Sequence, residues 1–222
     1  MGYFEMIDSA DIFVVFDHVQ FVRKSWQQRN RIKGPNGEIM LTIPVKKMPR
    51  STPICDIEIS YDNNNPLENH WKTITHTYKK ANHFGDYEEV FRQIYSKKHE
   101  KLGSLNVEII KTICHILGIR TKIVLSSELD LKDSSLGKTE RVINLCKKVG
   151  ITYLYDAKGA KELIDISLFD KESIQVEFQR YEHPVYSQLF GEFIPYLSVI
   201  DLLFNEGERA LAIMRAGRTQ IR

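Results

Sequence analysis

The sequence IFVVF, at residues 12–16, is a continuous apolar run with the length of a β-strand. Such a run is typical of a strand that is covered on both faces, as in the centre of a parallel sheet. Farther along the chain, predicted strands at 121–125, 151–155 and 174–178 alternate with predicted helices at 139–148 and 159–165. Strands that alternate with helices indicate parallel βαβ units. We therefore predict an α/β fold with a mainly parallel sheet flanked by helices.

The residues around this first strand predict a short helix, a hairpin and an edge strand. The helix is expected at 2–7. The turn sequence Pro35-Asn36-Gly37 indicates a hairpin whose strands lie at 30–33 and 38–45. Apolar and polar residues alternate over 54–60, which predicts an edge strand.

Apolar residues at helical spacing predict four further helices, at 66–78, 86–94, 104–117 and 199–206. Ser104 is the expected N-cap of the third, and Gly118 is its expected end. We expect a single domain over residues 1–222, with the helices near 66–118 as an insertion. The basic tail at 215–222 is expected to fray.

Composition excludes several classes of protein. The net charge of +2 argues against a general nucleic-acid-binding protein. Cys55, Cys114 and Cys146 are far apart and form no CxxC pair, so we expect neither a zinc site nor disulfides. Cys114 and Cys146 fall on apolar faces of predicted helices and are expected to be buried free thiols. No apolar run reaches the roughly 18 residues of a membrane-spanning helix. We therefore expect a cytoplasmic protein; the sequence leaves its oligomeric state open.

The segment that follows Asp17 is rich in cations. Residues 18–33 carry five cations and no anion, interleaved with one tryptophan and several amides. Ligands of open α/β sheets bind just beyond the carboxyl ends of strands, and guanidinium groups and amides there suit phosphate or carboxylate recognition. The alternative is an ordinary basic, solvated surface, but such a surface would normally carry compensating acids.

A second candidate lies at the start of the predicted helix at 139–148. The segment from Ser134 to Arg141 contains a glycine, hydroxyl groups and Lys138, and it could hold a phosphate through backbone N–H groups. The segment is not a P-loop, because Lys132 stands where that motif needs a glycine. The alternative is an ordinary helix start with a solvated Lys138.

The histidines give weaker indications. His70, His76 and His83 are spaced by six and seven residues, which does not place them on one helical face, so we predict no metal site. His70 either lines a pocket beside Trp71 or packs in the core or at the surface. The aromatic segment 183–191 either folds over a ligand or is a packed connection. No nucleophile elbow or Cys-His pair indicates nucleophilic catalysis.

At this point the chain resembles the WbqC-like family over nearly its whole length. The motifs that carry the resemblance, besides Asp17 and Trp26, are GYF at 2–4, VQF at 19–21, RNRIK at 29–33, LTIPV at 41–45, HWK at 70–72, KTER at 138–141, GEFIP at 191–195 and DLLFN at 201–205. The family is associated with bacterial surface-polysaccharide and O-antigen gene clusters. The resemblance therefore implies a role with nucleotide-linked sugars.

Two features depart from the family pattern. Members usually begin with a strand and a Gln-Pro-x-x-x-Pro-Trp loop before the Gly-Tyr-Phe, whereas here Met1 directly precedes Gly2. If that loop holds substrate, we expect its absence to impair activity. Members also often have Asp-Asp where this chain has Asp17-His18. A fainter resemblance, to HUP-type nucleotidyltransferase-like folds, is an analogy of fold only.

The resemblance implies a polysaccharide-biosynthesis enzyme, an amide-forming transferase or ATP-dependent ligase. It would transfer an acyl or aminoacyl group to the amine of a nucleotide-linked amino sugar, with ATP as the expected cofactor. The alternative is a non-catalytic nucleotide- or glycan-binding module that assists a neighbouring transferase. Asp17 and His18 are the predicted catalytic residues. The predicted substrate-binding residues are Gln20, Lys24, Trp26, Arg29, Asn30, Arg31, Lys33, His70, Lys138 and Thr139.

Overall fold

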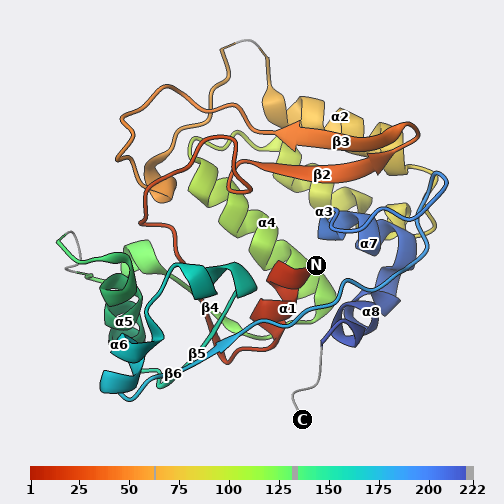
Figure 1. The fold of residues 1–222 in the computed structure, drawn as a ribbon. Helices are drawn as coiled ribbons and strands as arrows, with labels where there is room; N and C mark the ends of the chain where they lie inside the picture. The colour runs from red at the N-terminus through yellow and green to blue at the C-terminus, as the bar shows by residue number, and fades with distance from the viewer. Residues whose placement is uncertain (63, 132–134, 219–222) are drawn as a thin grey trace. The chain divides into compact units, whose positions relative to one another are not determined.

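Figure 1 shows the computed structural model, which describes residues 1–62, 64–131 and 135–218. The described chain forms two compact units. The first contains Met1, Asp17–Arg120 and His183–Gly217. The second contains Gly2–Phe16, 121–182 without the three undescribed residues, and Arg218. Each unit is described by itself.

The second unit is the α/β part of the chain. Its elements are α1 (Gly2–Asp8), β1 (Ile12–Val15), β4 (Lys122–Leu125), a 3-10 turn at Ser126–Glu128, α5 (Lys138–Val149), β5 (Tyr153–Asp156), a 3-10 turn at Lys158–Glu162, α6 (Ile166–Lys171) and β6 (Gln175–Phe178). Strand β1 pairs in parallel with β4, and β5 pairs in parallel with β6. The structure confirms the predicted α/β class, with short parallel sheets flanked by helices.

The first strand differs from its prediction in its surroundings. Every residue of β1 is half-buried rather than fully covered. Within the described residues β1 pairs only with β4, so it is not the centre of a larger sheet. A core cluster of this unit lies elsewhere: α5 and α6 place Ile143, Cys146 and Phe169 together, and Ile174 joins them just before β6. The apolar run at 12–16 indicated a strand correctly but overstated its burial.

The first unit is built around a β-hairpin and helices. Its elements are β2 (Arg29–Gly34), β3 (Gly37–Thr42), a 3-10 turn at Ile54–Asp56, α2 (Pro66–Tyr78), α3 (Phe84–Ser96), α4 (Leu102–Leu117), α7 (Val199–Glu206), a 3-10 turn at Gly207–Arg209 and α8 (Ala210–Ala216). Strands β2 and β3 pair antiparallel, from Arg29 opposite Thr42 to Gly34 opposite Gly37. Gly37 has a φ of 109°, which suits the tight turn. The predicted hairpin is therefore confirmed.

Local sequence explains where the helices of this unit begin and end. Asn65 caps α2, because its side-chain oxygen accepts hydrogen bonds from two backbone N–H groups, and Pro66 takes the first helical position. Gly118 ends α4 in the left-handed conformation, as predicted. The rings of Tyr78, Phe84 and Phe91 pack around Phe204, with centroid distances of 5.1 to 5.5 Å.

Some predictions of secondary structure were wrong. The predicted edge strand at 54–60 begins as a 3-10 turn and then makes only isolated bridges, although Ile57 and Ile59 are buried as their alternation suggested. Helix α4 starts at Leu102 after Lys101, so Ser104 is not its cap. The predicted helix at 159–165 is a 3-10 turn followed by α6. The expected frayed tail begins inside α8, and residues 219–222 lie outside the described chain.

Among the described residues, no helix combines the length and apolar character needed to cross a membrane.

Candidate anion-binding site

The loop that follows β1 is held to the body of the first unit by backbone hydrogen bonds. The N–H of Cys55 donates to the carbonyl of Asp17 at 2.9 Å, and the N–H of Ile54 donates to the carbonyl of Val19 at 3.0 Å. Asp17, a predicted catalytic residue, is only 4% exposed, and its neighbour His18 is half-buried. Backbone hydrogen bonds thus fix the loop at Asp17 and Val19, and Asp17 is buried.

Amide side chains shape the second part of this loop. Gln27 accepts the N–H of Val22 at 2.9 Å, and Gln28 accepts the N–H of Lys24 at 2.8 Å. The side chain of Asn106, on α4, donates to the carbonyl of Gln27 at 2.8 Å. Two of the amides in the basic segment therefore build the loop. The loop they build presents the next functional group, Trp26.

Three cations share one face of β2. Side chains of a strand alternate between its two faces, so Arg29, Arg31 and Lys33 project to the same side. Their burial differs, because Arg29 and Arg31 are half-buried whereas Lys33 is 1% exposed. We call the open part of this surface, formed by Trp26, Arg29 and Arg31, the basic face.

Trp26 stacks with both arginines of the basic face. Its ring is 62% exposed, and its centroid lies 5.6 Å from Cζ of Arg29 and 5.3 Å from Cζ of Arg31. Guanidinium groups at such distances from an indole are attracted by its π electrons. This arrangement holds an exposed aromatic surface beside two positive charges, which is a combination that suits a ligand with a flat ring and an anionic group.

The charge of Arg31 is partly compensated. Its Nη1 donates to both carboxylate oxygens of Glu38 at 2.9 Å, and its Nη2 donates to the carbonyl of Tyr196 at 3.1 Å. Tyr196 has a φ of 60°, a conformation that is rare for a non-glycine residue and is often kept where function requires it. Arg31 is therefore both a positioned cation and a tie to the segment that contains Tyr196.

Of the two arginines of the basic face, Arg29 is the one that the fold leaves available. Among the described residues, the structure records no hydrogen bond and no ion pair for its guanidinium group. Its Nε is buried and has no hydrogen-bond partner. A buried polar group without a partner is costly and calls for an explanation. Nε of Arg31 is buried and unpaired in the same way, but the terminal nitrogens of Arg29 are not among the buried atoms and have no recorded partner in the described chain. A bound phosphate or carboxylate could accept paired hydrogen bonds from these terminal nitrogens.

Lys33 is held by the protein itself. Its Nζ donates to the carbonyl of Glu192 at 2.5 Å and lies 3.5 Å from the carbonyl of Gly191. The backbone N–H of Lys33 donates to the hydroxyl of Tyr78 at 3.1 Å. A ligand would have to displace these groups to reach Lys33, and its predicted contact with a phosphate stays a prediction.

A buried carboxyl group that the sequence reasoning missed lies behind Lys33. Asp201, on α7, accepts hydrogen bonds from the hydroxyls of Tyr78 and Tyr186, both at 2.7 Å. Burial raises the pKa of Asp201, and the two hydroxyls and the charge of Lys33 oppose that rise. Burial and the nearby carboxylate together raise the pKa of Tyr78 above its usual range. An acid inside the apolar sequence VIDLLF was the signal that could have revealed this network.

The segment at 183–198 is packed by its own aromatic rings. The ring of His183 lies 5.0 Å from that of Tyr196, and the ring of Tyr186 lies 5.4 Å from that of Phe193. Phe190 has a positive φ of 62°. Within the predicted segment at 183–191, the carbonyl of Gly191 lies 3.5 Å from Nζ of Lys33, as in a packed connection, and folding over a ligand stays a prediction.

The other predicted residues of the first unit are more scattered. Gln20 and Lys24 are exposed in the loop, and Lys24 has a φ of 57°. Asn30 lies on the opposite face of β2 from the arginines, and its side chain accepts the N–H of Arg31 at 2.8 Å. His70, on α2, has its Nε2 3.1 Å from the carbonyl oxygen of Thr42.

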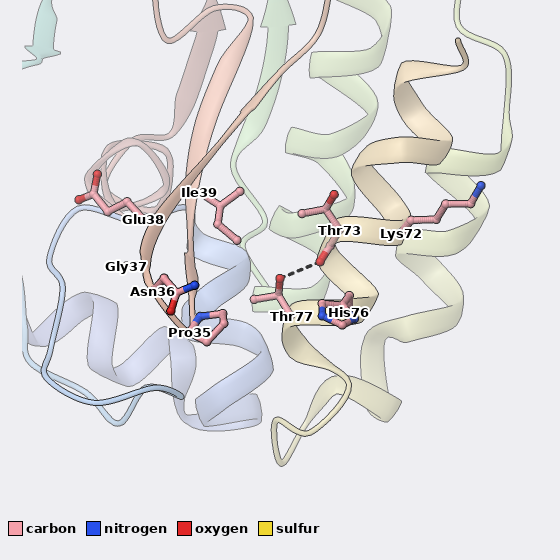
Figure 2. Close-up of a pocket in the computed structure, with 9 residues that line it drawn as sticks. All are labelled: Pro35, Asn36, Gly37, Glu38, Ile39, Lys72, Thr73, His76 and Thr77. Carbon is pink, nitrogen blue, oxygen red and sulfur yellow. Dashed lines mark hydrogen bonds between the residues drawn. The ribbon is translucent and has the colours of Figure 1, made fainter.

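Two hollows adjoin the hairpin. The larger, of about 440 Å³, lies between the turn at 35–39 and α2, where Thr73, His76 and Thr77 face the turn (Figure 2). It contains none of the predicted site residues. The smaller, of about 300 Å³, is bordered by His70 and Thr42.

Lys138 and Thr139 belong to the second unit, at the start of α5. Lys138 is exposed, whereas Thr139 is buried and its hydroxyl accepts the N–H of Asp165 at 3.0 Å. A Cβ at Gly137 would lie 2.4 Å from the carboxylate of Glu140, which is the flexible end of an exposed side chain and could move aside. Part of the predicted phosphate loop, including Ser134, lies outside the described residues. A phosphate contact here stays a prediction.

The second unit also contains a buried acid that the sequence reasoning missed. Glu5 accepts hydrogen bonds from Ser9 Oγ at 2.6 Å, Gln179 Nε2 at 2.5 Å and Arg218 Nε at 3.0 Å. Gln179 and Arg218 lie far from Glu5 in the sequence, so no local pattern indicated the cluster. In residues 1–62, 64–131 and 135–218, no group of three or more acidic, histidine or cysteine side chains is placed to hold a metal ion.

Comparison with known proteins identifies relatives but no solved structure. A profile of the WbqC-like protein family matches residues 1–213. The uncharacterized protein Rv1507c of Mycobacterium tuberculosis is 34% identical over 216 residues, which cover 96% of this chain and 92% of that protein. No solved structure matches the chain.

Proposed function

This chain belongs to the WbqC-like protein family, and we propose that it binds a nucleotide-linked sugar on its basic face in the biosynthesis of bacterial surface polysaccharide. The observation that carries the proposal is the Arg29 guanidinium, whose buried Nε has no partner beside an exposed tryptophan ring. In this proposal the diphosphate accepts hydrogen bonds from Arg29, and Arg31 adds positive charge. The base or the sugar stacks on Trp26.

The fuller proposal is that the bound amino sugar receives an acyl or aminoacyl group. An amide does not form directly from a carboxylate and an ammonium group in water, so ATP would activate the donor. The donor carboxylate would displace pyrophosphate from ATP, and the sugar amine would then attack the acyl carbon and release AMP. Asp17 or His18 would orient the amine or take its proton. The protein would contribute chiefly by positioning the two substrates.

The burial of Asp17 favours a second candidate function. A carboxyl group that is 4% exposed has little access to an amine unless the loop moves. A protein that binds a nucleotide-linked sugar or glycan and assists a neighbouring transferase needs the basic face but no catalytic acid or base. The two candidate functions therefore require the same ligand, but only the transferase converts it to a product.

Calorimetry and mass spectrometry separate these possibilities. UDP-N-acetylglucosamine and a UDP-linked amino sugar would serve as ligands, and the amino sugar would then be incubated with ATP and a mixture of amino acids and short carboxylic acids. Formation of an amide product supports the transferase, and binding without product supports the module. If neither ligand binds, both candidate functions are wrong.

A site variant and two controls show whether any binding is specific to the basic face. Arg29→Ala should abolish most of the binding. Arg92→Ala is the matched control, because Arg92 lies in the same unit but is exposed and paired with Glu89 on α3. Equal loss in both variants would contradict a specific site. A single-stranded oligonucleotide tests the nucleic-acid alternative, for which tight binding that falls steeply with salt is the signature.

A further inference from the structure

The smaller hollow has a lining of distinctive chemistry. Its volume is about 300 Å³, near the lower end of the range for ligand pockets. The lining residues are Thr42, Pro44, Ser60, Asn64, Pro66, Asn69 and His70. None of these side chains is a lysine, an arginine or an acid. The hollow is therefore polar but carries no fixed charge, in contrast to the basic face.

The hydrogen bond of His70 fixes the state of its ring. Its Nε2 lies 3.1 Å from the carbonyl oxygen of Thr42, which can only accept, so Nε2 carries the hydrogen. Burial lowers the pKa of His70, although the bond to Thr42 opposes this. The ring is then neutral near neutral pH, and Nδ1 is a hydrogen-bond acceptor. The described part of the chain supplies no donor to that atom.

Two carboxamides add donors and acceptors to the same lining. The structure records no hydrogen bond for the side-chain amides of Asn64 and Asn69 among the described residues. The hydroxyl of Ser60 donates to Asp62 at 2.7 Å, which leaves its oxygen able to accept. An imidazole acceptor with two amides matches a ligand that carries several hydroxyl or amide groups and no charge of its own, as a sugar ring does.

We propose that this hollow is a subsite for a neutral sugar ring, in which Nδ1 of His70 accepts a hydrogen bond from a ligand hydroxyl or amide N–H. The subsite adjoins the strand pair that carries Arg29, because Thr42 is the residue opposite Arg29 across the hairpin. The inference rests on the proposed function only in identifying this ring as the sugar of a nucleotide-linked sugar. Recognition of a free monosaccharide does not depend on the basic face.

Long-range proton–nitrogen NMR spectroscopy of the histidine rings tests the subsite directly. The probe is N-acetylglucosamine, which carries no charge, added without any phosphate up to about 50 mM, because a single small ring is expected to bind in the millimolar range. We expect the free protein to show the Nε2–H form of His70, and the sugar to shift the Nδ1 signal in a saturable way. A different tautomer, or an unshifted His70 signal at the highest concentration, would overturn the proposal.

Matched variants on α2 separate a local effect from a general one. His70→Gln should weaken monosaccharide binding about tenfold or more, which corresponds to about 1.4 kcal/mol. His76→Gln is the control, because His76 lies on the same helix but borders the other hollow. Equal weakening by both variants, with both folded, would contradict the assignment.

Arg29→Ala distinguishes this inference from the proposed function. It should leave binding of the free monosaccharide unchanged while weakening binding of UDP-N-acetylglucosamine. If the free sugar shifts His70 but the nucleotide-linked sugar does not bind, the subsite stands and the proposed function fails. If the nucleotide-linked sugar binds without any effect on His70, the subsite is refuted.

Discussion

Arg29 and Lys33 lie on the same face of the same strand, four positions apart, yet the fold uses them differently. Lys33 is buried, and its ammonium group is bound by backbone carbonyls of the segment at 183–198. Arg29 lies beyond the contacts recorded for that segment, with its buried Nε unpaired and an exposed tryptophan beside it. The comparison shows that cations on one strand can have different roles. Lys33, at one end of β2, is structural, whereas Arg29, at the other end, is a candidate for ligand binding.

The largest expected effect is on stability, at the structural end. Lys33→Met should lower the free energy of unfolding by about 3 kcal/mol, because it leaves two carbonyls unpaired and removes a positive charge near buried Asp201. Urea denaturation followed by circular dichroism measures this. A variant as stable as the wild type, but deficient in ligand binding, would reverse the roles assigned to the two cations.

The binding end should respond in the opposite way. Arg29→Ala should change the free energy of unfolding by no more than about 0.5 kcal/mol, since it removes a group whose Nε is already unsatisfied. It should weaken binding of UDP-N-acetylglucosamine by about 10- to 100-fold. Arg29→Lys should restore only part of that affinity, because lysine cannot form paired hydrogen bonds. Unfolding of Arg29→Ala in the same urea titration would make Arg29 structural.

The pH dependence of stability tests the network behind Lys33. The pKa of Asp201 is raised in the folded protein, so its contribution is fully present below the unfolded-state pKa and is lost as the pH rises through the raised value. Relative to Asp201→Asn, the wild type should therefore lose stability as the pH rises from about 4 toward neutrality. Denaturation at several pH values measures this, and a constant difference would contradict the raised pKa.

The smallest expected effect concerns the aromatic part of the basic face. Trp26→Ala removes a ring that is mostly exposed, so the stability should change little. Affinity for the nucleotide-linked sugar should fall about fivefold, because one stacking interaction contributes about 1 kcal/mol. Trp26→Phe should retain part of the affinity in calorimetry. If Trp26→Ala binds as tightly as the wild type, the ring plays no part in recognition.

Local sequence patterns predicted the parts of the fold that local contacts determine. The Pro35-Asn36-Gly37 turn, the apolar stripe of α2 and the glycine after α4 each act within a few residues, and each was confirmed. The segment at 54–60 was not, because its alternating isoleucines are buried without forming a paired strand. Alternation indicates which residues face inward, but not whether a partner strand exists.

The sequence predicted which types of residue form the candidate site, but not which of its cations are buried. The cations and Trp26 stood out in the sequence. The separation of Arg29 from Lys33 did not, because the segment that buries Lys33 lies more than 150 positions away. The same holds for Glu5, whose partner Arg218 is near the other end of the chain. Burial that depends on such distant contacts leaves no local signature in the sequence.

The most direct test of the account is the NMR signal of the Arg29 Nε–H during a titration with UDP-N-acetylglucosamine. We predict a saturable shift of this signal together with that of the Trp26 indole N–H, while Arg92 stays unchanged. Saturated binding elsewhere on the protein with Arg29 unshifted, or no shift at any concentration up to about 10 mM, would contradict the claim that Arg29 binds the anion.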